Sequence, residues 1–133
     1  MNKPPSSAAW VQQWVAKAEN DLKNAEHTLR MDPQDCPYDT VCYHAQQCAE
    51  KYLKAFLVSL NADFPKIHDI GELLALLPIP HNQMVSVEEA EKLSDYATSS
   101  RYPSDPDPLT SVEASSALSI THKIRTAVRQ QLL

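Results

Sequence analysis

The chain contains a single glycine, Gly71, but ten prolines, and this combination restricts the fold more than any other feature. A β-sandwich or barrel of this length needs many turns that favour glycine, so a few long helices are the better solution. Proline is poorly tolerated inside helices and marks where they stop. The prolines gather in short groups: Pro4, Pro5, Pro33, Pro37, Pro65, Pro78, Pro80, Pro103, Pro106 and Pro108. The sequence therefore predicts an all-α fold.

Apolar residues recur every three or four positions in the stretches between the prolines, which is the period of one helix face. The first such stripe consists of Trp10, Trp14, Ala18, Leu22, Ala25 and Leu29. Three later stretches begin with capping boxes, in which a short polar side chain and an acidic one satisfy the first backbone N–H groups of a helix. The boxes are Asp69 with Glu72, Ser86 with Glu89, and Thr110 with Glu113. We predict an antiparallel helical bundle in one domain, 1–133, with helices near 8–30, 37–61, 69–77, 86–98 and 110–131.

The second predicted helix has an apolar arc that covers about half of its circumference or more. Such a helix contacts several neighbours, so we expect it at the centre of the bundle. Its remaining polar face holds His44, Gln47, Lys51 and Lys54, whose spacing of three or four residues makes them project together. An imidazole and two ammonium groups could bind phosphate or transfer protons near an anion. The alternative is an ordinary solvated helix face.

Two short segments outside the second helix also carry reactive side chains. In Arg101-Tyr102-Pro103, the arginine could bind phosphate with two parallel hydrogen bonds and the tyrosine could stack on a base. The alternative is a plain loop, with Arg101 capping a helix end and Tyr102 packed on the bundle. The pair His68-Asp69 suggests catalysis, but adjacent residues rarely point at each other and Asp69 is already explained as a helix cap.

Several functions are excluded or disfavoured by composition. The net charge of −5 disfavours non-specific binding of RNA or DNA, although it leaves room for a local basic site. No apolar run approaches the roughly 20 residues that cross a membrane, and we expect a cytoplasmic protein with reduced cysteines. Neither the cysteine nor the histidine spacing fits a metal site, and one glycine cannot build a phosphate-binding loop, so we expect no metal and no cofactor.

The run Tyr43-His44-Ala45-Gln46-Gln47-Cys48-Ala49-Glu50-Lys51-Tyr52-Leu53-Lys54-Ala55 resembles the signature second helix of HEPN domains. That family's pattern reads approximately aromatic-x-A-Q-Q-A-A-E-K-x-L-K-A. Matching residues flank the run in the family's order: Trp14, Ala18 and Asp21-Leu22 before it, then His68-Asp69, Leu73-Leu74 and Arg101-Tyr102-Pro103 after it. The resemblance covers nearly the whole chain, from about residue 10 to residue 132.

The resemblance implies a five-helix up-and-down bundle of a kind that commonly dimerises, and a link to nucleotide binding. Many bacterial members are encoded beside a minimal nucleotidyltransferase and form toxin–antitoxin-like pairs with it, so the resemblance implies such a partner here. The resemblance also favours a ligand-binding role for five residues: His44, Lys51, Lys54, Arg101 and Tyr102. Endonuclease members of the wider family carry an arginine followed four to six residues later by a histidine. None of the arginines here has a histidine at that distance: Arg30, Arg101, Arg125 and Arg129 all fail, and Arg125 follows His122 in the wrong order.

Three hypotheses follow. The leading one is a non-catalytic module that captures a nucleotide's phosphates with Arg101, Lys51 and Lys54 and stacks the base on Tyr102. The enzyme alternative is a metal-independent RNA endonuclease that uses Arg101 and His44 from separate helices. The third is a purely structural homodimer.

Overall fold

The computed structural model describes residues 7–98 and 108–132, and within these ranges it contains only helices and loops. The helices are α1 (Ser7–Leu29), α2 (Tyr38–Ser59), α3 (Ile70–Ala75), a 3-10 turn η1 (His81–Gln83), α4 (Val87–Thr98) and α5 (Ser111–Leu132). The prediction of an all-α bundle with five helices is confirmed. No helix in the described ranges is long and apolar enough to cross a membrane.

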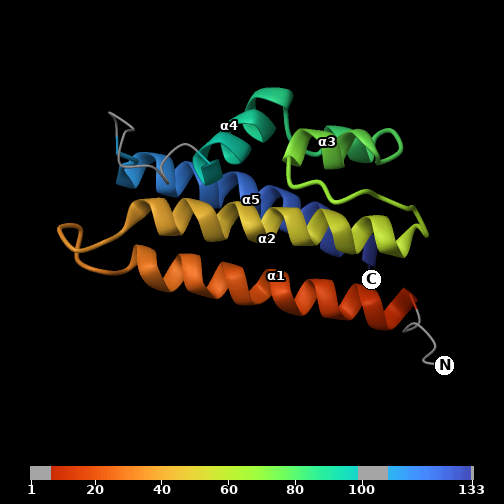
Figure 1. Ribbon diagram of the computed structural model, residues 1–133, viewed down its shortest axis with the longest axis horizontal. Coiled ribbons are helices and arrows are strands. Elements are labelled where there is room, and N and C mark those ends of the chain that lie inside the picture. The colour runs from red at the N-terminus through yellow and green to blue at the C-terminus, as the bar shows by residue number, and fades with distance from the viewer. Residues whose placement is uncertain (1–6, 99–107, 133) are drawn as a thin grey trace.

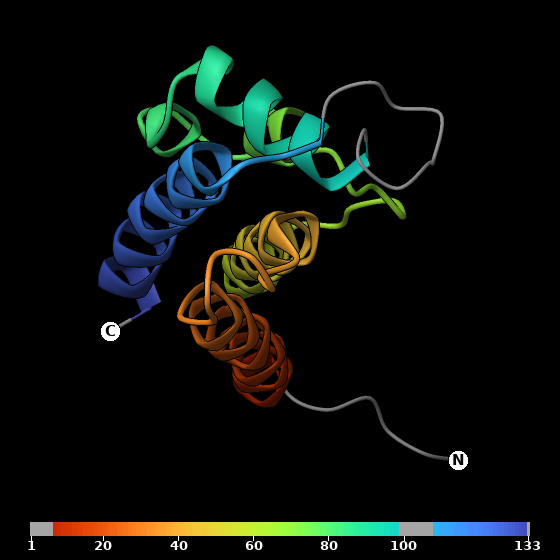
Figure 2. The ribbon, with the colours of Figure 1, turned by 90° about the vertical axis from the view of Figure 1, so that its left-hand side faces the viewer.

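Helix α2 lies at the centre of the bundle (Figure 1). It contacts all four other α-helices: α1 and α5 run along two of its sides, and α3 and α4 lie across a third (Figure 2). This position explains its wide apolar arc, because one helix can be buried on several sides only if apolar residues occupy most of its circumference. The predicted central role of α2 is confirmed.

The capping boxes define the starts of the later helices. The Asp69 carboxylate accepts the Glu72 N–H at 2.9 Å. Ser86 and Glu89 cap each other, with the Ser86 N–H donating to the Glu89 carboxylate at 3.1 Å and the Glu89 N–H donating to the Ser86 hydroxyl at 3.0 Å. Helix α3 ends at Ala75, two residues earlier than predicted, and the chain then turns ahead of Pro78.

The apolar stripe of α1 is buried in its middle and exposed at its start. Ala18, Leu22 and Ala25 are buried, whereas the Trp10 side chain is 40% exposed. The first turn of α1 lies at the end of the bundle, where the Ser7 hydroxyl donates to the Asn61 side chain just after α2.

The three cysteines are separate thiols, and Cys42 and Cys48 are buried in α2. Burial disfavours the charged thiolate and raises the pKa of the Cys42 thiol to about 12. It raises the pKa of the Cys48 thiol as well. These two side chains act as small apolar residues of the core.

Candidate functional site

A single polar stripe runs along the middle of α2. Between Val41 and Leu57, only Tyr43, His44, Gln47 and Lys51 are not fully buried. Their spacing places them on successive turns of one helix face. Within this part of α2, the stripe is what a ligand can reach directly.

Asp21 of α1 holds two basic groups of the stripe together. Its carboxylate accepts a hydrogen bond from His44 Nδ1 at 2.8 Å and forms an ion pair with the Lys51 ammonium. A carboxylate only accepts, so the His44 proton sits on Nδ1 and the ring leaves Nε2 for other partners. The Lys51 charge is balanced by Asp21, and the Asp21 side chain is only 11% exposed.

A second carboxylate, Glu50, is buried beneath the stripe. Lys54 Nζ donates to it at 3.1 Å, and His68 Nδ1 lies 3.2 Å from both of its oxygens. The Lys54 side chain is 7% exposed, and its ammonium lies 5.5 Å from the centre of the Trp14 ring. The prediction that Lys54 projects together with His44, Gln47 and Lys51 is therefore wrong. Because Glu50 lies one helical turn before it, Lys54 turns inward to pair with this carboxylate.

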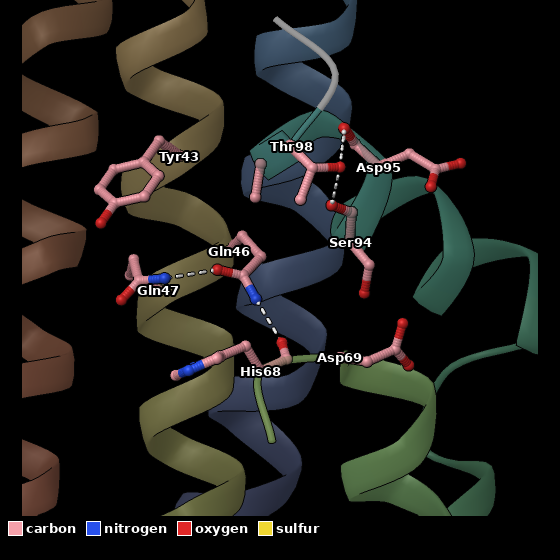
Figure 3. Close-up of a pocket in the computed structure, with 9 residues that line it drawn as sticks. Tyr43, Gln46, Gln47, His68, Asp69, Ser94, Asp95 and Thr98 are labelled. Carbon is pink, nitrogen blue, oxygen red and sulfur yellow. Dashed lines mark hydrogen bonds between the residues drawn. The ribbon is translucent and has the colours of Figure 1, made fainter. Parts of the chain in front are cut away.

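A pocket of about 450 Å³ opens between α2, the start of α3 and the last turns of α4 (Figure 3). Helix α2 contributes Tyr43, Gln46 and Gln47, and His68 lies at the segment that leads into α3. The end of α4 closes the pocket, with Thr98 among its lining residues. The His68 side chain is 75% exposed, so its ring is accessible at the mouth. The described lining contains amides, hydroxyls, carboxylates and an imidazole but no lysine or arginine.

The HEPN domain model matches residues 11–131 of the chain. The chain belongs to the HEPN family. Among solved structures, TT1696 from Thermus thermophilus is similar with a TM-score of 0.74 and 30% identity, covering 90% of this chain and 96% of that one. ST0689, an archaeal HEPN homologue, is similar with a TM-score of 0.72 and 26% identity, covering 92% of this chain and 98% of that one. No curated protein is significantly similar to the chain.

The predicted ligand-binding residues of this HEPN domain are only partly brought together. His44 and Lys51 meet on Asp21, whereas Lys54 is separated from them by its pairing with Glu50. Arg101 and Tyr102 lie outside the described residues. The role of these five residues in ligand binding stays a prediction.

His68 and Asp69 do not act on each other. Asp69 caps α3, as the sequence predicts, and His68 points instead to Glu50 of α2. Sequence reasoning missed Glu50 and Asp21 as the acidic partners of the site. Both lie in stretches that match the HEPN pattern, but nothing local in the sequence shows that a histidine 18 residues further along meets Glu50.

A second polar network joins α1, α2 and α5 of the HEPN bundle. Arg125 donates to both carboxylate oxygens of Glu19, from Nε at 2.9 Å and from Nη2 at 2.8 Å. Arg129 Nη1 donates to the Tyr52 hydroxyl at 3.2 Å. The hydrogen bonds from Arg125 lower the pKa of the Glu19 carboxyl to about 2, against an opposing effect of burial. This bidentate ion pair links the two outer long helices.

Proposed function

We propose that this HEPN domain is a non-catalytic nucleotide-binding module, with a minimal nucleotidyltransferase as its partner in a toxin–antitoxin-like pair. The observation that carries the proposal is the polar pocket beside the α2 stripe, which combines an aromatic ring, two amides and an exposed imidazole. Small-molecule sites are concave and contain a few placed polar groups. Amides and aromatic rings can pair with and stack on a nucleobase.

Capture of the phosphates requires positive charge that the described lining does not supply. Lys51 and Lys54 are each paired with a carboxylate, so neither offers an uncompensated charge. Arg101 follows the pocket residue Thr98 by three positions, and three residues of chain span at most about 11 Å. We therefore propose Arg101 as the main phosphate ligand, with Tyr102 as a stacking ring and with Lys51 and His44 in lesser roles.

The variant Arg101→Ala should bind a nucleotide at least about tenfold more weakly than the wild type, because a charge-assisted hydrogen bond contributes about 1.5–3 kcal/mol. Its melting temperature should stay the same if the side chain acts on the ligand. Titration calorimetry with ATP and thermal denaturation measure the two quantities. Lys51→Ala should cost less, since its ammonium is already paired with Asp21.

An Arg101→Ala variant that unfolds, or a wild type that binds no nucleotide, would contradict this proposal. The RNA endonuclease is tested on the same protein by incubating it with RNA in the presence of a chelator. Cleavage that disappears in His44→Ala and Arg101→Ala would support the endonuclease in place of the binding module.

We also propose that the domain forms a homodimer. The arc of α2 is covered within one chain, so the apolar surface for a dimer must come from elsewhere. Leu76, Ile79 and Val87 are 42%, 78% and 75% exposed and lie close together in the sequence, around the turn between α3 and α4. Light scattering should give twice the 14.9 kDa mass of the chain.

The variant Val87→Asp should convert the dimer to a monomer, because it places a charge among the exposed apolar side chains that we propose for the interface. Aspartate is well tolerated in the first turn of a helix, so the fold should remain. Val112→Asp is the matched control, because Val112 is 74% exposed in the first turn of α5. A wild type that scatters as a monomer at micromolar concentration would refute the dimer.

A further inference from the structure

The Gln46 amide has a fixed orientation at the floor of the pocket. Its Nε2 donates to the backbone oxygen of His68 at 2.8 Å and lies 3.4 Å from a Glu50 carboxylate oxygen. Both groups can only accept hydrogen bonds. Turning the amide over would place its oxygen against two acceptors. Because Gln46 is only 3% exposed, water could not relieve that contact. Gln46 therefore keeps its nitrogen toward His68 and Glu50, and its oxygen toward Gln47.

The orientation of Gln46 determines that of Gln47. Gln46 Oε1 accepts a hydrogen bond from Gln47 Nε2 at 2.8 Å, as the dashed lines in Figure 3 show. Since Oε1 of Gln46 cannot donate, the Gln47 amide must present its nitrogen to it. The Gln47 oxygen consequently points away from Gln46. Among the described residues, no group donates to this oxygen.

Gln47 thus offers a ligand a defined pair of polar groups. Its Oε1 accepts, and the second hydrogen of its Nε2 can donate, because only one is used by Gln46. Tyr43 lies one helical turn before Gln47, and Figure 3 shows its ring on the same side of α2 as the Gln47 amide and the His68 ring. An amide that both accepts and donates suits a ring that bears an amino group next to a ring nitrogen.

We propose that this pocket reads the base of its ligand and selects adenine through Gln47, an inference that rests on the proposed nucleotide binding. The adenine amino group donates to Gln47 Oε1, and an adjacent ring nitrogen accepts from Gln47 Nε2. Glutamine recognises adenine in this bidentate way in other settings. Gln46 is the positioning residue, because it holds the amide of Gln47 in the adenine-binding orientation.

The test compares adenosine with purine riboside, which has the same ring and sugar and lacks only the amino group. Titration calorimetry on the full chain should show adenosine binding about tenfold more tightly, because purine riboside leaves the Gln47 oxygen without a donor. Neither probe has a phosphate, so this ratio does not depend on Arg101. Equal affinities for the two nucleosides would overturn adenine selection.

The variant Gln47→Met keeps the length of the side chain and removes both polar groups. It should lower the affinity for both nucleosides and leave them bound equally well, so that the ratio of their affinities falls to about one. Gln13→Met is the matched control, since Gln13 is an exposed helical glutamine on α1, and it should keep the ratio of the wild type. A Gln47→Met variant that still prefers adenosine tenfold would show that another group reads the base.

The outcomes separate this inference from the function on which it rests. If ATP binds and the two nucleosides bind equally, the domain is a nucleotide-binding module without adenine selection. If neither ATP nor adenosine binds, both proposals are wrong. Because the comparison of the nucleosides uses the wild-type protein, the inference stays testable even if a variant fails to fold.

Discussion

Replacing Lys54 with alanine should lower the free energy of unfolding by about 3 kcal/mol, because it removes one partner of a buried ion pair. The Lys54 and Glu50 side chains are 7% and 4% exposed, so the Glu50 charge would stay in the interior without its main counter-charge. His68 and Gln46 remain as hydrogen-bond partners of Glu50, which keeps the expected loss near the lower end for a broken buried pair. Urea denaturation of the two proteins measures the difference.

Lys51→Ala is the control for this measurement. Lys51 lies on the same helix and also pairs with a carboxylate, but its side chain is 23% exposed and Asp21 keeps His44 as a partner. We expect a loss of only about 1 kcal/mol. If Lys54→Ala costs no more than Lys51→Ala, the Lys54–Glu50 pair is not an important part of the core.

Glu19 should make the protein more stable at neutral pH than at low pH. The pKa of its carboxyl falls from 4.5 to about 2 on folding, chiefly through the hydrogen bonds from Arg125. A lowered folded-state pKa gives stability that is fully present above the unfolded pKa of 4.5 and is lost as the pH falls toward 2. Since the carboxylate is 26% exposed, we expect about 2 kcal/mol, less than the full equivalent of the shift.

The variant Glu19→Gln should therefore be about 2 kcal/mol less stable than the wild type at pH 7 and about equally stable near pH 2. Urea denaturation at a series of pH values gives the difference directly. A difference that is the same at both ends of the range would show that Glu19 contributes through packing and not through its charge.

The helices could be predicted well from the sequence because their signals are local. Each capping box spans four residues, and the prolines interrupt the helical pattern within a few positions. The exposure of Trp10 could not be predicted, because it depends on where the bundle ends and not on the pattern of α1 itself.

The site was less predictable because its contacts join distant parts of the chain. The spacing of His44 and Lys51 predicts that they lie on one face of α2. It does not predict that both pair with Asp21, which lies on another helix. Glu50 and Lys54 are visible in the sequence as a pair one turn apart. Such a pair is normally solvated, and only the position of α2 at the centre of the bundle buries it. The ligand-binding roles of Arg101 and Tyr102 stay predictions.

The contact of α2 with all four other α-helices has a consequence for how the chain folds during synthesis. Helices α1 and α2 are joined by a short connection, so their hairpin can form early and at a low entropic cost. Helix α5 completes the bundle last, through contacts such as the Thr121 hydroxyl with the Ala45 carbonyl oxygen, which are 76 positions apart. Until α5 leaves the ribosome, the side of α2 that it covers stays open to chaperones and to other nascent chains.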